Sequence, residues 1–255
     1  MLRHALWMAL LASIAMADSK LVSVFGPGEQ TEYEVSYLGL VAGRAQLTVG
    51  WPTEQFGHAV WPLVCVGETT SFGSVFPVKD RFISYWDPMD RRTLGADFFV
   101  NENRKKRKER YEYDAANNQA IVTRQLEGQA PYELRYDIEQ GTLDLAAAGF
   151  GLRNEQLVVG ERHEMPVFLG NRYYRMQATV VARETLKTPL GELEVFRVTV
   201  NGDFNGKLAT KGLMTLFYTA DEKQLPVRAE AEFLLGKIRL EAVKYAQGRV
   251  YPGAE

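Results

Sequence analysis

The 255-residue sequence has one cysteine, Cys65, and only three histidines. A single cysteine excludes a disulfide within the chain. The ligand spacings H-x-x-x-H and C-x-x-C do not occur, so no metal site is predicted. The nucleophile pattern G-x-S-x-G is missing as well. We therefore expect neither a metal ion nor a cofactor. No sequence motif indicates an enzyme that uses a nucleophilic serine.

Neither basic nor acidic residues are in clear excess. The chain carries 30 Lys and Arg against 32 Asp and Glu, for a formal net charge of −2 at pH 7. A near-neutral balance gives no overall attraction for a polyanion, and we expect no nucleic-acid partner.

Long hydrophobic runs are rare, and the clearest lies at residues 5–17. It follows Arg3 and His4 and ends in Ala15-Met16-Ala17, the small residues that a signal peptidase reads. About 20 apolar residues are needed to span a bilayer, so this run is too short for a membrane helix. The sequence predicts a signal peptide at residues 1–17, cleaved near Ala17, and a periplasmic mature chain without a transmembrane segment.

What the sequence has in abundance is alternation of apolar and polar residues, the pattern of half-buried strands. Segments 32–37 and 44–49 alternate around a glycine turn, and segments 227–233 and 238–242 do the same. Such short strands with one polar face indicate an antiparallel sheet. The best helical candidate, residues 137–154, is weakened by Gly141, Gly149 and Gly151, and a second turn is expected near residues 71–78.

These patterns predict an all-β fold, mainly antiparallel: a strongly curved sheet or an open or partly closed barrel with one or two short helical segments. Residues 18–255 are expected to form a single large β domain. The alternative is two halves that meet near residues 137–155.

Several short motifs occur in a characteristic order along the mature chain. They are Phe25-Gly26-Pro27-Gly28-Glu29, Tyr33, Tyr37, Ala42-Gly43-Arg44-Ala45, Arg153, Leu157, Gly160, Thr188-Pro189-Leu190-Gly191, Phe196-Arg197-Val198, Tyr218-Thr219-Ala220-Asp221, Leu225-Pro226-Val227-Arg228 and Gly236-Lys237-Ile238. Together they resemble the bacterial domain-of-unknown-function family 3108. The resemblance implies an exported envelope protein with a β-rich fold, and it carries over no catalytic residue.

A basic segment follows Asn103, and it departs from the family pattern. Arg104, Lys105, Lys106, Arg107 and Lys108 precede Glu109 and Arg110. Beside Tyr111 and Tyr113, these cations could bind phosphates or sulfates on lipid or glycan headgroups. They could equally form a solvated hairpin end or an edge strand, where lysines prevent unwanted strand pairing.

Aromatic residues gather between positions 72 and 99 and recur later in the chain. A curved antiparallel sheet can leave an apolar pocket on its concave face, and aromatic walls with a few polar groups suit a lipid or glycan. The residues expected to contact such a ligand are Phe82, Tyr85, Trp86, Phe98, Tyr173 and Phe217, with Arg153 as a polar contact.

The sequence thus favours an exported, non-catalytic β protein that binds an amphipathic ligand, lipid or glycan, or an envelope partner on a concave apolar face. One alternative is a hydrolase of envelope glycans that uses Asp80 or Asp87. The other is a structural partner of an outer-membrane complex. A continuous apolar pocket favours binding, two converging carboxyl groups favour the hydrolase, and a flat apolar patch favours the structural role.

Overall fold

The structure is a computed structural model that describes residues 23–70, 77–102, 105–204, 207–208, 214–233 and 236–249. The expected signal segment 1–17 and Arg104 lie outside the described residues, as does most of the helical turn expected at residues 71–78.

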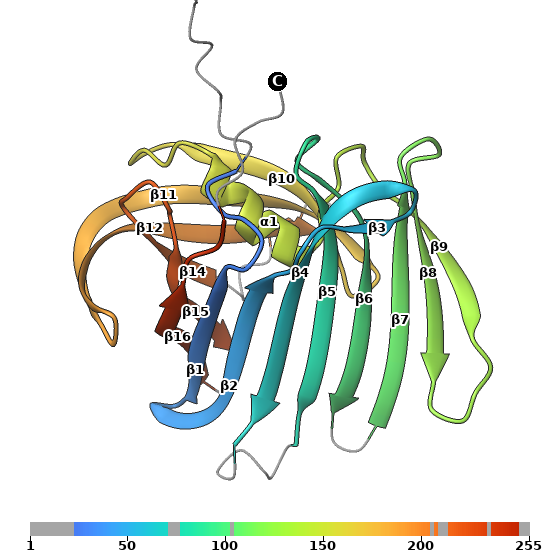
Figure 1. Cartoon of the computed structure of the whole chain (residues 1–255), viewed down its shortest axis with the longest axis horizontal. Helices are drawn as coiled ribbons and strands as arrows, with labels where there is room; N and C mark the ends of the chain where they lie inside the picture. The colour runs from blue at the N-terminus through green and yellow to red at the C-terminus, as the bar shows by residue number, and fades with distance from the viewer. Residues whose placement is uncertain are drawn as a thin grey trace, which may run out of the picture.

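Antiparallel strands make up most of the described chain, as the alternation predicts (Figure 1). The first half of the chain contains β1 (Gln30–Tyr37), β2 (Leu40–Val49), β3 (Thr53–Gln55), β4 (His58–Thr69), β5 (Lys79–Asp87), β6 (Arg92–Glu102), β7 (Lys105–Asp114), β8 (Gln119–Leu126) and β9 (Tyr132–Asp137). The second half contains β10 (Arg162–Leu169), β11 (Arg172–Thr188), β12 (Gly191–Phe204), β13 (Lys207–Leu208), β14 (Met214–Thr219), β15 (Pro226–Phe233) and β16 (Gly236–Ala246).

The strands form one continuous sheet in the order β10-β11-β12-β14-β15-β16-β1-β2-β4-β5-β6-β7-β8-β9, with β13 added to β12 and β3 to β4. The first and last long strands, β1 and β16, pair along their length and so join the two halves of the chain. Among the described residues, β9 and β10 do not pair with each other, so the sheet is open rather than closed into a barrel.

The sheet is strongly curved, and α1 (Leu145–Gly151) lies on its concave side between the halves (Figure 1). Register shifts interrupt the ladders in strands β1, β5, β11 and β14, at Glu32/Tyr33, Val35/Ser36, Ser84/Trp86, Val180/Ala182 and Phe217/Tyr218. Because a bulge bends and twists its strand, these shifts account for part of the curvature.

Among the described residues, helix is confined to α1 and the following 3-10 turn η2 (Leu152–Asn154), two short helical segments within the 137–154 candidate. Asp144 begins α1, since its carboxylate accepts a hydrogen bond from the backbone N–H of Ala147 at 2.9 Å. The described residues contain no helix with the length and apolar character needed to cross a membrane.

Buried side chains tie the two halves and α1 together. Phe25, Trp86 and Phe150 pack in one cluster that joins the N-terminal segment, β5 and α1. A second cluster joins Tyr33 of β1 to Val195 and Phe217 of the other half. The core is therefore shared across the β1–β16 junction.

Candidate ligand pocket

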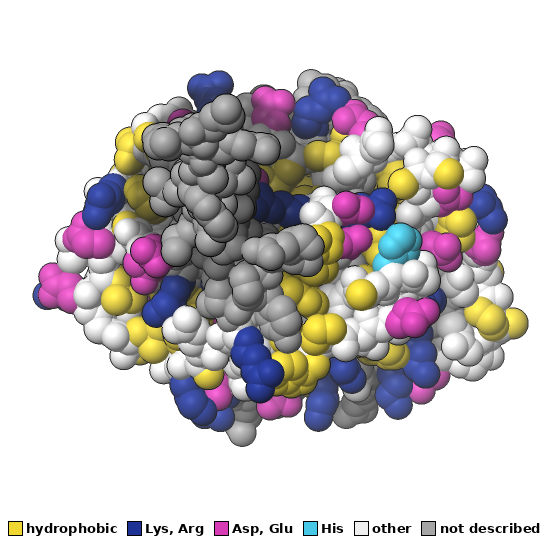
Figure 2. All heavy atoms as spheres, turned by 45° about the horizontal axis from the view of Figure 1, so that its top comes forward, with side chains coloured by type: hydrophobic (Ala, Val, Ile, Leu, Met, Phe, Trp, Pro, Cys, Tyr) yellow, Lys and Arg dark blue, Asp and Glu magenta, His cyan; other side chains and the backbone are white. Residues whose placement is uncertain are grey.

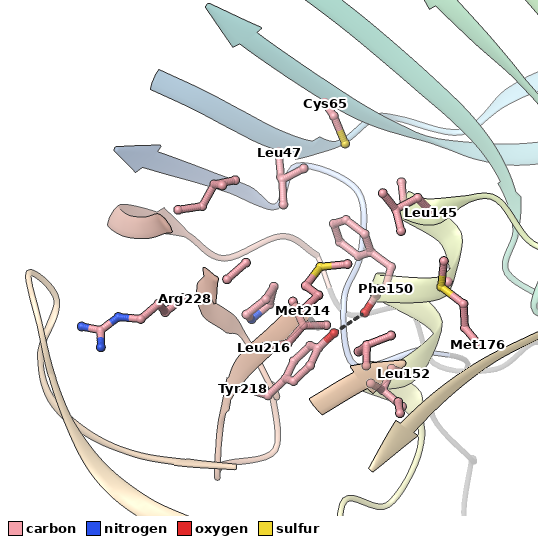
Figure 3. Close-up of a pocket in the computed structure, with 18 of the residues that line it drawn as sticks. Leu47, Cys65, Leu145, Phe150, Leu152, Met176, Met214, Leu216, Tyr218 and Arg228 are labelled. Atoms are coloured by element: carbon pink, nitrogen blue, oxygen red, sulfur yellow. Dashed lines mark hydrogen bonds between the residues drawn. The ribbon is translucent and has the colours of Figure 1, made fainter. Parts of the chain in front are cut away.

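A pocket of about 330 Å³ lies between α1 and the concave face of the sheet (Figure 3). Both halves of the chain contribute to its wall. The lining residues are Tyr33, Leu47, Cys65, Phe82, Leu145, Ala146, Ala148, Gly149, Phe150, Leu152, Met165, Met176, Ala178, Val200, Met214, Leu216, Tyr218, Pro226, Arg228, Ala229 and Leu240.

The wall is almost entirely apolar, and its polar groups already have partners. The Tyr218 hydroxyl donates to the carbonyl of Gly149 at 3.1 Å, and the Tyr33 hydroxyl donates to the carbonyl of Pro226 at 2.7 Å. Burial raises the pKa of both tyrosines, which keeps them protonated donors. Arg228 is held by Glu241. The pocket therefore suits an apolar group such as a hydrocarbon chain better than a polar one.

Three methionines, Met165, Met176 and Met214, line the pocket from β10, β11 and β14, and Met165 and Met176 are paired partners on neighbouring strands. Methionine is unbranched and polarizable, so its side chain adapts to partners of irregular shape. A wall of this kind can repack around ligands of different length.

Cys65 lines the pocket but is not a nucleophile at neutral pH. Burial, with a smaller contribution from the charge of Asp144, raises the pKa of its thiol to about 12. Since the thiolate is the reactive form, this cysteine serves as an apolar wall residue.

A buried polar cluster fixes α1 above the pocket. Thr93 on β6 donates to the Asp144 carboxylate at 3.0 Å, and the hydroxyls of Ser84 and Thr93 lie 3.3 Å apart. Burial raises the pKa of Asp144, although the hydrogen bonds that it accepts oppose the shift. The cluster ties the N-terminus of the helix to β5 and β6.

A second pocket, of about 360 Å³, adjoins the first, since Ala148, Leu152 and Met165 line both. Its other lining residues include the polar Arg91, Glu155, His163 and Glu164. The indole N–H of Trp86 and the Nε2 atom of His163 are buried here without a hydrogen-bond partner among the described residues. An apolar pocket thus adjoins a polar one.

The aromatic residues expected at the ligand are distributed over several parts of the fold. Phe82 lines the apolar pocket, and its ring lies 4.4 Å from that of Phe98, measured between centroids. Phe98 and Tyr173 pack with the cluster around Phe168, beyond the pocket wall. Phe217 is buried in the cluster that includes Tyr33.

Trp86 and Tyr85 point to opposite faces of β5, as neighbours in a strand do. Trp86 packs in the core against Phe25 and lines the second pocket rather than the first. Tyr85 packs against Phe56, away from the concave face, and donates to Asp97 at 2.6 Å. The structure therefore does not bring these two side chains together.

Arg153, the expected polar contact, is fully buried and engaged within the protein. Its guanidinium pairs with Glu29, the shortest contact being 2.6 Å, and donates to the carbonyl of Lys223. It also lies over the rings of Phe25 and Phe150. These contacts join the N-terminal segment, α1 and the β14–β15 turn, so the residue organises the fold around the pocket.

The charged candidates lie elsewhere. Lys105, Lys106, Arg107 and Lys108 are exposed at the start of β7, which is an interior strand. Asp80 and Asp87 lie near opposite ends of β5, about 23 Å apart at the usual strand rise. Glycosidase carboxyl groups need about 5–10 Å, so these two do not form a catalytic pair.

The small and flexible lining residues were not expected from the sequence. Ala146, Ala148 and the three methionines contribute to the wall. In the sequence alone, nothing distinguishes any of them from an ordinary core residue. The one sequence pattern that could have indicated lining residues is the alternation that includes Met176 and Ala178, because it places both on the same face of a strand.

The sequence matches the model of a family described as "Protein of unknown function (DUF3108)" over residues 32–243. The comparison with curated proteins found no match. Among solved structures, a β-barrel-like protein of domain of unknown function DUF1849 from Brucella abortus is similar, with a TM-score of 0.60 and 10% sequence identity. The alignment covers 88% of this chain and 99% of that one, and at this identity it supports the fold alone.

Two further structures align with TM-scores too low to carry an argument. One is a candidate exported protein with a YmcC-like fold from Bacteroides fragilis, with a TM-score of 0.36, 12% identity and coverage of 89% of this chain and 100% of that one. The other is a candidate lipoprotein from Parabacteroides distasonis, with a TM-score of 0.34, 9% identity and coverage of 89% and 99%.

Proposed function

This chain belongs to the DUF3108 family of proteins of unknown function, and for it we propose a non-catalytic role as an exported protein that binds an amphipathic lipid. The hydrocarbon chain of the lipid occupies the apolar pocket under α1. Its polar end lies toward the adjoining pocket that contains Arg91 and His163.

The observation that carries this proposal is the composition of the pocket wall. Tyr33 and Tyr218 already donate their hydroxyl hydrogens to backbone carbonyls, and the rest of the wall is dominated by leucine, methionine and alanine. A glycan needs unpaired donors and acceptors around it, whereas a hydrocarbon chain needs none. The pocket therefore favours the lipid over the glycan.

The competing functions have less support. Asp80 is engaged by the backbone N–H of Asn101, and Asp87 accepts hydrogen bonds from the turn that follows β5. Neither carboxylate faces the other across a cleft, which speaks against a glycan hydrolase. A concave pocket, rather than a flat apolar patch, also speaks against a purely structural role.

A fluorescent fatty acid tests the proposal directly. Dansylaminoundecanoic acid should bind the mature protein in the micromolar range, about −8 kcal/mol. Ala229 on β15 and Ala146 on α1 line the pocket from opposite sides and are only half-buried. Ala229→Phe and Ala146→Phe should each fill the space and weaken binding at least about tenfold.

Ala116→Phe is the matched control, because Ala116 is exposed in the turn between β7 and β8, away from the pocket. This variant should bind the probe like the parent protein. The proposal is wrong if the parent protein does not bind the probe, or if both pocket-filling variants bind it with unchanged affinity while they remain folded.

Export is the second part of the proposal, and it rests on the apolar run at residues 5–17 with its Ala15-Met16-Ala17 end. N-terminal sequencing of the protein recovered from the periplasm should begin at Asp18 or very near it. A cytosolic product that retains Met1 would contradict export without bearing on the lipid pocket.

A further inference from the structure

The turn between β1 and β2 and the first residues of β2 present large apolar side chains to solvent. Leu38 is 64% exposed, Leu40 54% and Val41 40%. Two-residue turns of this kind usually carry Asn and Gly, which accept a positive φ. Here Leu38 has φ 50° and Gly39 has φ 82°. A leucine in this conformation is strained. The end of the Leu38 side chain lies close to Gly236 of β16, yet most of the side chain remains exposed.

The basic residues of β7 lie on the same rim of the sheet, the lower rim in Figure 1. The antiparallel register carries the rim from the start of β2 to the end of β4, the start of β5, the end of β6 and the start of β7. Four strand spacings separate β2 from β7, which is about 19 Å. The apolar turn and the basic run therefore face the same side of the molecule.

Part of the positive charge of this rim is left without an acidic partner. Lys79 pairs with Glu68, Lys106 with Glu127, and Arg107 with both Glu102 and Glu109. Lys105 and Lys108 are exposed and make no ion pair within the described ranges. Charges act over about 8 Å at physiological salt, so a local basic run is effective even in a chain with a small net negative charge.

We propose that this rim docks on the surface of an anionic phospholipid bilayer, with the β1–β2 turn inserted at the interface and the β7 lysines against the headgroups. Apolar side chains and cations on one rim form the pattern of interfacial membrane binding, in which burial of apolar side chains and attraction to anionic lipid act together. The face seen in Figure 2, which brings the opposite, upper rim of Figure 1 forward, carries charges of both signs.

A bilayer fits this rim better than a protein partner does. A stable protein interface needs a broad, well-packed patch with buried aromatic anchors. The exposed apolar residues here belong instead to one narrow turn, and the cations stand apart from it along the rim. The proposal does not depend on what the pocket under α1 binds.

Co-sedimentation with vesicles tests the docking. The mature protein should bind vesicles of phosphatidylcholine containing about a third phosphatidylglycerol, and should bind pure phosphatidylcholine much more weakly. Raising the salt to about 0.5 M should weaken binding to the anionic vesicles. The double variant Leu38→Asp, Leu40→Asp and the triple variant Lys105→Gln, Lys106→Gln, Lys108→Gln should each reduce the partition coefficient at least about tenfold.

Met89→Asp provides the matched control, since Met89 is 63% exposed in the turn after β5 at the opposite rim. It should bind vesicles like the parent protein, and all variants should keep the parent's circular dichroism and melting temperature. The proposal fails if the parent protein does not bind anionic vesicles, which would leave a protein partner as the occupant of the rim. It also fails if Met89→Asp reduces binding as much as the Leu38/Leu40 variant does.

Discussion

Asp144 shows how one buried carboxyl group can make the stability of the fold depend on pH. It caps α1, accepts a hydrogen bond from Thr93 and has a pKa raised by burial. A carboxyl group whose pKa is higher in the folded state binds its proton more tightly there. The free energy of unfolding therefore falls as pH rises above the ordinary value of 3.8.

The variant Asp144→Asn should remove this pH dependence, because an amide can cap the helix without carrying a charge. Urea melts between about pH 4 and pH 7 should show the parent protein losing stability relative to the variant as pH rises. Asp144→Ala is the control for the hydrogen bonds. It leaves Thr93 and the Ala147 N–H without this partner and should cost about 1–3 kcal/mol at both ends of the range. Parallel pH profiles for the parent protein and Asp144→Asn would contradict the raised pKa.

Residue identity alone was a poor guide to the pocket, and the reason is physical. Phe98, Tyr173 and Phe217 pack against other core side chains, because large rings fill a core efficiently. The pocket persists where small or flexible residues such as Ala146 and Met214 leave space. Sequence shows which residues are apolar, but the space left between them depends on how distant strands meet.

At the scale of elements, the sequence predicts local pairing well. The hairpin of residues 32–37 and 44–49 is observed as β1 and β2, since alternation and a glycine turn act within a few residues of each other. One or two short helical turns were expected within residues 137–154, and α1 and η2 lie there, at Leu145–Gly151 and Leu152–Asn154. Residue 137 belongs instead to β9, because the three glycines of the range do not favour a longer helix.

The position of a strand within the sheet was harder to predict. The basic run at residues 104–110 was expected at a hairpin end or in an edge strand. Lys105, its first described residue, does begin β7 at the end of the β6–β7 hairpin, yet β7 is paired on both sides, with β6 and β8. Charged residues at a strand end can stay solvated on both faces, so charge density does not distinguish an edge strand from an interior one.

For the whole molecule, the prediction is that residues 18–255 unfold as one domain. We expect a single cooperative transition, because the β1–β16 ladder is continuous and one core cluster holds Tyr33 together with Phe217 and Val227. Separating the halves would expose this cluster to water on both sides, which hydrophobic burial opposes.

The distribution of tryptophan makes this expectation testable without mutation. Trp51, Trp61 and Trp86 all lie in the half that contains β1–β9, and the fourth tryptophan, Trp7, belongs to the expected signal segment. Tryptophan fluorescence therefore reports on the first half, whereas far-ultraviolet circular dichroism reports on strands in both halves. For a single domain, urea transitions followed by the two signals should coincide in midpoint and slope. If circular dichroism instead shows an additional transition that fluorescence does not, β10–β16 unfold separately, and the alternative of two halves meeting near residues 137–155 is correct.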